Sequence, residues 1–158
     1  MQLERDYPER GKGAVGLTFL LKGGGEVRSA VPAPPARTDG LWKTTCFELF
    51  VKPEESDGYY EFNFSPSGAW AAYAFEGYRA GMRDLDIDPP EIRRLDCRIV
   101  VTVDLSPIPA GRWRVGLSAV IEERDGLKSY WALVHPSGKP DFHHDDCFAL
   151  ELPAASGA

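Results

Sequence analysis

Residues 41–53 read LWKTTCFELFVKP, residues 59–68 read YYEFNFSPSG, and residues 69–78 read AWAAYAFEGY. Each stretch is rich in aromatic or β-branched residues. Its apolar residues either alternate with polar ones or follow one another without interruption. Turn-forming residues separate the stretches, EESDG at 54–58 and SPSG at 65–68. Apolar runs with such punctuation are typical of consecutive antiparallel strands joined by hairpins. This part of the chain therefore predicts three neighbouring strands.

The first of these strands has one apolar face and one mixed face. Successive side chains of a strand point to opposite faces, so every second residue shares a face. The face predicted to meet the core holds Thr45, Phe47, Leu49 and Val51. The opposite face holds Cys46, Glu48 and Phe50. A glutamate among apolar neighbours must be solvated, paired, or turned towards a ligand.

The second strand shows the same division. Its core face is predicted to hold Tyr60, Phe62 and Phe64. Its other face holds Tyr59, Glu61 and Asn63. If the two strands pair, Glu48 becomes a cross-strand neighbour of Glu61 or Asn63 on one polar face.

Outward from this centre, the remaining strands are predicted over residues 14–21, 26–31, 69–75, 95–105, 113–121, 128–134 and 147–152. Within 95–105 the residues expected to point inwards are Leu95, Cys97, Ile99, Val101, Val103 and Leu105. Loops are expected over residues 1–13, 31–40, 76–92 and 140–146. The strand patterns also predict core positions for Trp70, Trp113 and Trp131. No amphipathic helix is visible, which argues against a parallel α/β fold.

These elements predict an all-β fold, an antiparallel β-sandwich of jelly-roll type with about 8–10 strands and little helix. The 158 residues favour one domain over 1–158, in which 1–13 and 153–158 are peripheral. The net charge of −6 argues against nucleic acid and against an anionic membrane surface as partners. No signal peptide is visible, so a cytoplasmic location is expected.

Three cysteines, Cys46, Cys97 and Cys147, each fall in a predicted strand. An odd number of cysteines without a visible export signal is typical of a reducing compartment. We therefore expect buried free thiols. In an exported protein one disulfide could form, and the sequence does not select the pair.

Residues 41–51, residues 59–70 and the tail PDFHHDDCFALEL at 140–152 together resemble family 9 carbohydrate-binding modules and the wider DOMON-like group of β-sandwich domains. The resemblance implies a site in which a tryptophan stacks on a sugar beside a glutamate, an arginine and a second aromatic residue. Trp42 and Glu48 stand at the first two positions, and Arg79 is the arginine. The chain has no second tryptophan there, and Phe142 or His143 stands near that position.

An aromatic face packs against the C–H groups of a sugar, while carboxylate or guanidinium groups bind its hydroxyls. The predicted ligand-binding residues are Trp42, Glu48, Glu61, Asn63, Arg79, Phe142 and His143. The competing interpretation is structural: Trp42 caps the core at a sheet edge, and Glu48 pairs with an arginine such as Arg98. The partner expected from the binding interpretation is a saccharide or another small polar ligand.

No cofactor is expected from the sequence, and a divalent metal and haem b are the two alternatives. His143, His144 and Asp146, beside Asp141 and Asp145, have the chemistry of metal ligands. In the competing interpretation His143 holds its loop by hydrogen bonding and His144 is solvated.

Some DOMON relatives bind haem b through a methionine and a histidine, which here would be Met82 and His135, His143 or His144. A haem-binding electron-transfer domain is thus one alternative function, and a module that docks a partner protein is another. No nucleophile elbow, P-loop, dinucleotide fingerprint or HExxH motif appears. Glu48 and Glu61 as a glycosidase pair are disfavoured, and we expect no enzymatic activity.

Overall fold

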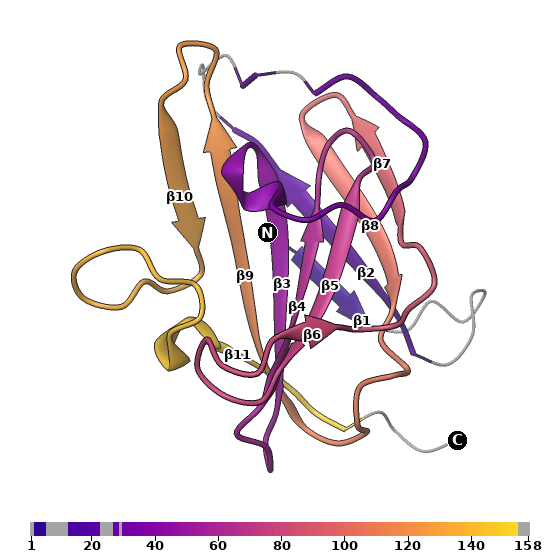
Figure 1. Ribbon diagram of the computed structural model, residues 1–158, viewed down its shortest axis with the longest axis vertical. Helices are drawn as coiled ribbons and strands as arrows, with labels where there is room; N and C mark the ends of the chain where they lie inside the picture. Colours follow the sequence, from indigo (N-terminus) through magenta and orange to yellow (C-terminus); the bar gives the residue numbers. More distant parts are fainter. Residues whose placement is uncertain (1, 6–12, 23–26, 29, 155–158) are drawn as a thin grey trace.

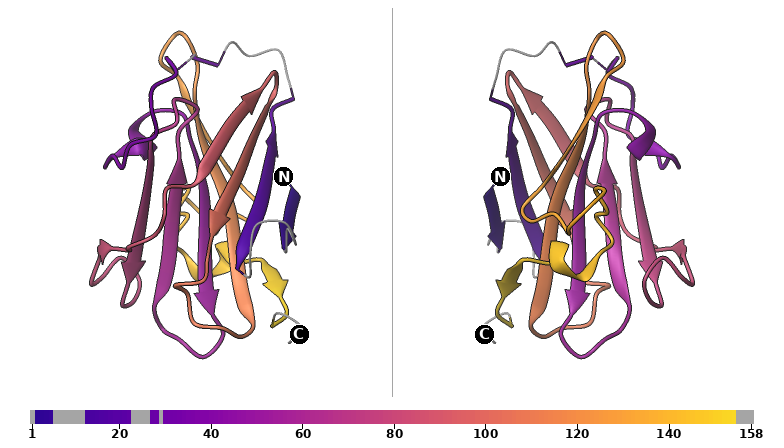
Figure 2. Two further views of the ribbon diagram at one scale, coloured as in Figure 1. Left: turned by 90° about the vertical axis from the view of Figure 1, so that its right-hand side faces the viewer. Right: turned by 90° about the vertical axis from the view of Figure 1, so that its left-hand side faces the viewer.

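The protein folds as two antiparallel β-sheets that face each other (Figures 1 and 2). The computed structural model describes residues 2–5, 13–22, 27–28 and 30–154, with the backbone alone for 2–5. One sheet has four strands in the order β1-β2-β8-β7. The other has seven, in the order β10-β9-β3-β4-β5-β6, with β11 paired to β9. The predicted all-β antiparallel sandwich is confirmed.

The four-stranded sheet comprises β1 (Gln2–Arg5), β2 (Ala14–Leu20), β7 (Glu91–Leu95) and β8 (Arg98–Asp104). The seven-stranded sheet comprises β3 (Cys46–Pro53), β4 (Tyr59–Phe64), β5 (Trp70–Phe75), β6 (Arg83–Asp84), β9 (Trp113–Glu122), β10 (Lys128–Ala132) and β11 (Leu150–Leu152). The described helices are two single 3-10 turns, η1 (Leu41–Lys43) and η2 (Asp145–Cys147). Within the described residues, no helix is both long and apolar enough to cross a membrane.

The predicted single strand over 95–105 is wrong at its start. The chain reverses at Asp96 and Cys97, so that β7 and β8 form a hairpin with Leu95 opposite Arg98. Asp96 has φ 48, a left-handed conformation that aspartate tolerates better than most residues. The turn leaves Leu95 and Cys97 exposed instead of buried, because Leu95 closes the hairpin and Cys97 lies in the turn itself.

Three other expectations also need correction. The N-terminal segment expected to be irregular contains the strand β1, which pairs with β2. The expected long loop over 76–92 contains β6 and the start of β7. The return strand predicted over 26–31 falls partly outside the described residues, and within them Val27 forms one isolated bridge with Glu123.

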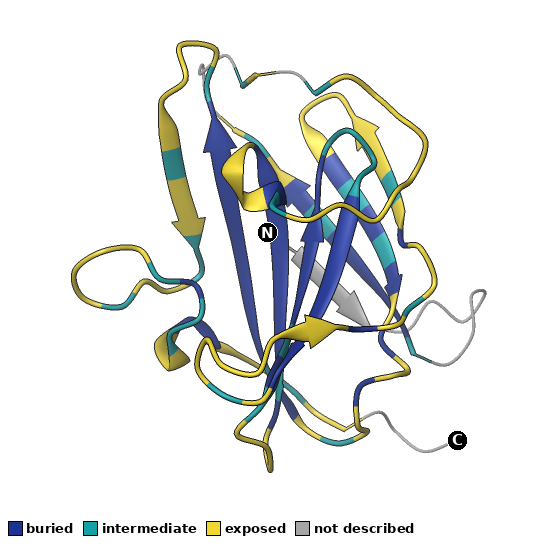
Figure 3. Ribbon diagram, viewed as in Figure 1, coloured by how far each residue is buried: buried dark blue, intermediate teal, exposed yellow. Residues whose placement is uncertain are grey.

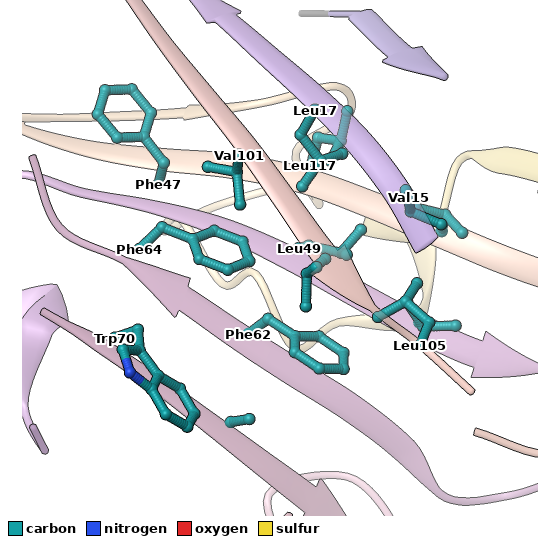
Figure 4. Close-up of a cluster of buried hydrophobic side chains, with 14 of the residues drawn as sticks. Val15, Leu17, Phe47, Leu49, Phe62, Phe64, Trp70, Val101, Leu105 and Leu117 are labelled. Atoms are coloured by element: carbon teal, nitrogen blue, oxygen red, sulfur yellow. The ribbon is translucent and has the colours of Figure 1, made fainter. Parts of the chain in front are cut away.

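The main core lies between the two sheets and follows the predicted alternation. Phe47, Leu49, Phe62 and Phe64 of the large sheet are at most 1% exposed. They face side chains of β2 and β8 such as Val101 (Figure 4). Each such side chain contributes roughly 1.5–3 kcal/mol by leaving water. The predicted core face of residues 45–51 is confirmed.

The seven-stranded sheet is also covered on its outer face. Strands β3, β4, β5 and β9 are buried along almost their whole length (Figure 3). A sheet covered on one face alone would alternate between buried and exposed residues. A second apolar cluster on the outer face contains Leu41, Cys46, Phe50, Tyr59, Ala71, Tyr73, Phe75, Val120, Phe142 and Phe148. Phe142 and Phe148 belong to the C-terminal segment, residues 140–152, which lies across the outer face of the sheet.

The tryptophans and cysteines divide according to this coverage. Trp70 and Trp113 are 4% exposed, as predicted, whereas Trp131 is 58% exposed and its predicted core position is wrong. Trp131 lies on β10, the outermost strand, beyond the reach of the narrower four-stranded sheet. All three cysteines are free, and only Cys46 and Cys147 are buried.

Gly116 should tolerate no side chain, because the C-terminal segment lies directly on it. A Cβ at Gly116 would come within 2.8 Å of the Cys147 carbonyl oxygen, whereas one at Gly77 would meet nothing within 4 Å. We expect Gly116→Ala to lower the free energy of unfolding by about 1–3 kcal/mol through overpacking. Urea unfolding monitored by fluorescence measures the change. Gly77→Ala is the control, and equal stabilities of the two variants would contradict this account of the outer layer.

Candidate functional site

The outer face of the seven-stranded sheet contains a cavity of about 410 Å³. Strands β3, β4, β5 and β9 supply its floor, while η1, the 76–82 loop, β10 and the C-terminal segment supply its walls. The cavity is lined by Trp42, Glu48, Glu61, Tyr73, Phe75, Arg79, Met82, Val120, Tyr130, Pro140, Asp141, Phe142 and His143. A volume of this size is within the range of small-molecule sites.

Glu48 lies at the centre of the floor and is 2% exposed. In the sheet register it stands opposite Asn63 on one side and Ser118 on the other. Ser118 Oγ donates a hydrogen bond of 2.9 Å to Glu48 Oε2. Arg98 lies in the opposite sheet, so the expected ion pair between Glu48 and Arg98 does not form.

Glu61 is the second carboxyl of the floor and is 5% exposed. Its Oε1 accepts a hydrogen bond of 2.8 Å from Asn63 Nδ2, and its Oε2 lies 3.8 Å from His143 Nε2. Asn63 is fully buried, and its Oδ1 has no hydrogen-bond partner among the described residues. The floor therefore consists mainly of hydrogen-bond acceptors.

Burial raises the pKa of both carboxyl groups. The pKa of Glu48 rises to about 8, because burial and the nearby charge of Glu61 outweigh the hydrogen bond from Ser118. The pKa of Glu61 rises to about 7, because burial outweighs the hydrogen bond from Asn63 and the charge of Arg79. Glutamates perturbed in this way are more frequent at functional sites than elsewhere, although structural networks also produce them.

His143 forms the inner wall and is held in one orientation. Tyr59 Oη accepts a hydrogen bond of 3.2 Å from the Arg79 backbone N–H, and lies 2.7 Å from His143 Nδ1. We therefore assign the Tyr59 hydroxyl as the donor to Nδ1, which places the ring hydrogen on Nε2, towards Glu61. Burial, with the charge of Arg79, lowers the pKa of His143 to about 4, so the ring is neutral at pH 7.

Arg79 and Asp141 connect two loops at the rim. Arg79 has φ 52, and its Nη2 lies 2.8 Å from Asp141 Oδ1. Tyr78 Oη donates to the other carboxylate oxygen of Asp141. Burial alone would raise the pKa of Asp141, but the bonds from Tyr78 and Arg79 outweigh it and lower the pKa. The rim thus holds an ion pair between Arg79 and Asp141, whereas the described residues of the floor form no ion pair with a charged partner at pH 7.

Six of the seven predicted ligand-binding residues line this one cavity. The exception is Asn63, which lies on the floor between Glu48 and Ala71 without lining the space. Sequence reasoning missed Tyr73, Phe75 and Tyr130. The alternation of β5 could have indicated the first two. Tyr73 pairs with Glu61, and Phe75 lies on the same face of the sheet. Nothing local to β10 indicates that Tyr130 meets the cavity.

The predicted metal ligands do not converge. His143 points to Tyr59 and Glu61, whereas His144 Nδ1 lies 3.5 Å from Asp146 Oδ2 and accepts from the Asp146 backbone N–H. Among the described residues, no group of three or more histidine, cysteine, aspartate or glutamate side chains is arranged to hold a metal ion.

Haem b fits the cavity poorly. Met82 and His143 both line it, but Met82 is 57% exposed. The floor beneath them presents the carboxyl groups of Glu48 and Glu61, and an apolar macrocycle would cover them without supplying donors to their remaining oxygens. His135 does not line the cavity, and its ring contacts Phe142 instead.

The buried carboxyls should make the protein less stable as pH rises from 6.5 to 8. A raised folded-state pKa contributes stability below the ordinary value of 4.5, and this stability is lost as pH rises through about 7 and 8. The lowered pKa of His143 acts in the opposite sense, but only between about 4 and 6.5. The expected loss is at most about 1.4 kcal/mol per pH unit for each carboxyl.

Urea unfolding at pH 6.5 and at pH 8 measures this loss. Glu48→Gln retains the acceptor for Ser118 but cannot ionise, so its unfolding free energy should depend less on pH than that of the wild type. Identical pH dependence of the two proteins would show that Glu48 does not hold a proton in the folded state.

The sequence matches no protein-family model and no curated protein. Among solved structures, the fold is similar to that of a Bacteroides uniformis ATCC 8492 protein that is provisionally described as carbohydrate-binding. The TM-score is 0.50 at 14% sequence identity, and the alignment covers 85% of this chain and 68% of that chain. The likeness thus supports the all-β fold, and the resemblance to family 9 modules or DOMON domains stays a prediction.

Proposed function

We propose that the protein is a non-catalytic binding domain for a carbohydrate or sugar derivative. One observation is the main support: Trp42, 42% exposed, lies at the same cavity as the buried carboxyls of Glu48 and Glu61. An indole face packs against the C–H groups of a sugar ring, and carboxylates accept hydrogen bonds from its hydroxyls.

The aromatic part of the site is larger than the sequence indicated. Tyr73 and Phe75 extend from the floor, and Tyr130 stands on β10, 47% exposed. Tyr73 Oη donates a hydrogen bond of 2.7 Å to Asp39 Oδ1, which fixes the ring against the floor. A rigid aromatic surface binds at low entropic cost, because few side-chain rotations are lost on binding.

The polar part of the site is already oriented. Ser118 and Asn63 hold the two carboxyls, Tyr59 holds His143, and Asp141 holds Arg79. Groups fixed before binding contribute affinity and specificity, because the ligand need not order them. The provisional description of the Bacteroides protein with a similar fold agrees with this proposal.

Two other functions have less support. A haem-binding electron-transfer domain requires a cavity that accepts an apolar macrocycle, and the acidic floor argues against it. A protein-docking module would use an exposed apolar surface without a pocket, whereas the polar groups here converge on a cavity.

Trp42→Ala should weaken saccharide binding at least tenfold, because it removes the exposed stacking surface. Trp131→Ala is the matched control, since Trp131 is 58% exposed on β10 but does not line the cavity. A glycan array identifies the saccharide, and isothermal titration calorimetry then compares the three proteins. Equal affinities for wild type and Trp42→Ala, or no binding to any glycan, would overturn the proposal.

A further inference from the structure

The cavity floor offers more acceptors than the protein itself satisfies. Among the described residues, Ser118 supplies a donor to only one of the two Glu48 carboxyl oxygens. Asn63 supplies a donor to one oxygen of Glu61, while its own Oδ1 has no partner. A ligand that completes this floor must therefore bring hydrogen-bond donors.

The register places the two carboxyls where both can bind one group of a ligand. Glu48 is opposite Asn63 and Phe50 is opposite Glu61, so the two glutamates are diagonal neighbours on paired strands. Such neighbours are ~7–8 Å apart at the backbone, within reach of a shared partner between long side chains. Both side chains line the cavity.

No cation of the described part of the chain is committed to this pair. At the rim, Arg79 Nη2 lies 2.8 Å from Asp141 Oδ1, so Arg79 is paired there. The ring of His143 is neutral at pH 7. The other titratable groups near the floor, Cys46 and Tyr73, bring no positive charge. Two buried carboxyls with no cation bonded to either of them must hold protons or repel each other.

The aromatic lining of the cavity also suits a positive charge. Trp42, Tyr73, Phe75 and Tyr130 all line the same cavity as the two glutamates. The faces of aromatic rings attract cations, and desolvated pairs of this kind contribute about 2 kcal/mol or more. This surface is independent of the carboxyls, and it favours the same ligand charge.

We propose that the preferred ligand is an amino sugar, whose protonated amino group is held between Glu48 and Glu61. This inference rests on the proposed saccharide function and names the substrate class. An ammonium group brings three donors and one positive charge, which bond to the unsatisfied acceptors and offset the negative charge of an ionised carboxyl. The sugar ring then packs on the aromatic walls, and the rim ion pair of Arg79 and Asp141 meets its hydroxyls. A neutral hydroxyl at the same place supplies one donor and no charge.

Binding of the ammonium should release protons. Burial raises the pKa of Glu48 to about 8 in the free protein, so this carboxyl is largely protonated at pH 7. A cation beside the carboxyl favours its ionised form and lowers its pKa. The protein therefore gives up a proton to the buffer when the amino sugar binds, and a neutral sugar causes no such release.

The test uses three β-1,4-linked trisaccharides that differ at C2: the trimers of glucose, glucosamine and N-acetylglucosamine. Calorimetry at pH 6, where the amino groups of the glucosamine trimer already carry their protons, in two buffers of different ionisation enthalpy gives the affinity and the number of protons released. We expect the glucosamine trimer to bind at least tenfold more tightly than the other two and to release protons. Equal or tighter binding of either neutral trimer would overturn the amino-sugar inference and leave the saccharide function standing.

Putrescine, an amine without a sugar ring, distinguishes failure of the saccharide function from failure of the amino-sugar inference. Binding of putrescine as tight as that of the glucosamine trimer would overturn the saccharide function, since the ring would then add nothing. No binding by any of the four compounds would overturn the amino-sugar inference, and the glycan array decides the saccharide function separately.

Glu48→Gln tests the role of the carboxyl, because it keeps the shape and removes the charge. It should weaken binding of the glucosamine trimer at least tenfold, reduce the preference for this trimer over the glucose trimer, and abolish much of the proton release. Glu55→Gln, in the exposed turn after β3, is the matched control and should behave as wild type. Unchanged selectivity in Glu48→Gln would contradict the assignment.

Discussion

The burial of two carboxyl groups beneath an aromatic cover is the constraint on which this structure depends. Glu48 and Glu61 lie on strands whose other face is the hydrocarbon core, so neither can turn away from the outer layer. Burial of an ionised carboxyl without a cation is costly, and their raised pKa values express that cost. A fold that keeps such groups needs hydrogen-bond donors in place around them, or a ligand that supplies them.

The C-terminal segment turns this sheet face into a cavity. It returns across β9, where Gly116 lets the Cys147 carbonyl come close, and it inserts Phe142 and Phe148 into the second apolar cluster. The same segment carries Asp141 to the rim and His143 to the inner wall. Apolar packing and polar orientation are therefore supplied together by residues far along the chain from the floor.

Much of the fold could be predicted from local pattern. The two-residue period of residues 45–51 and 59–64 assigns each side chain to a face. Pairing those strands predicts Glu61 or Asn63 as the cross-strand neighbour of Glu48, and the observed register selects Asn63. The alternation over 95–105 was misleading, because it continues through a tight turn at Asp96 whose left-handed backbone no apolar pattern shows. Trp131 was assigned to the core for a similar reason. An edge strand has the same alternation whether or not a second sheet reaches over it.

By itself, the sequence determined the all-β class, the central strands with the core between the sheets, and three polar residues of the site floor, Glu48, Glu61 and Asn63. Each of these follows from period, turn chemistry and residue type within about ten positions of the chain. Only the tertiary structure decided what covers the outer face, that Tyr130 and Asp141 meet Trp42 at one cavity, and that Trp131 stays in water. These contacts join segments up to about a hundred residues apart, and their register depends on how whole layers pack, which no local period encodes.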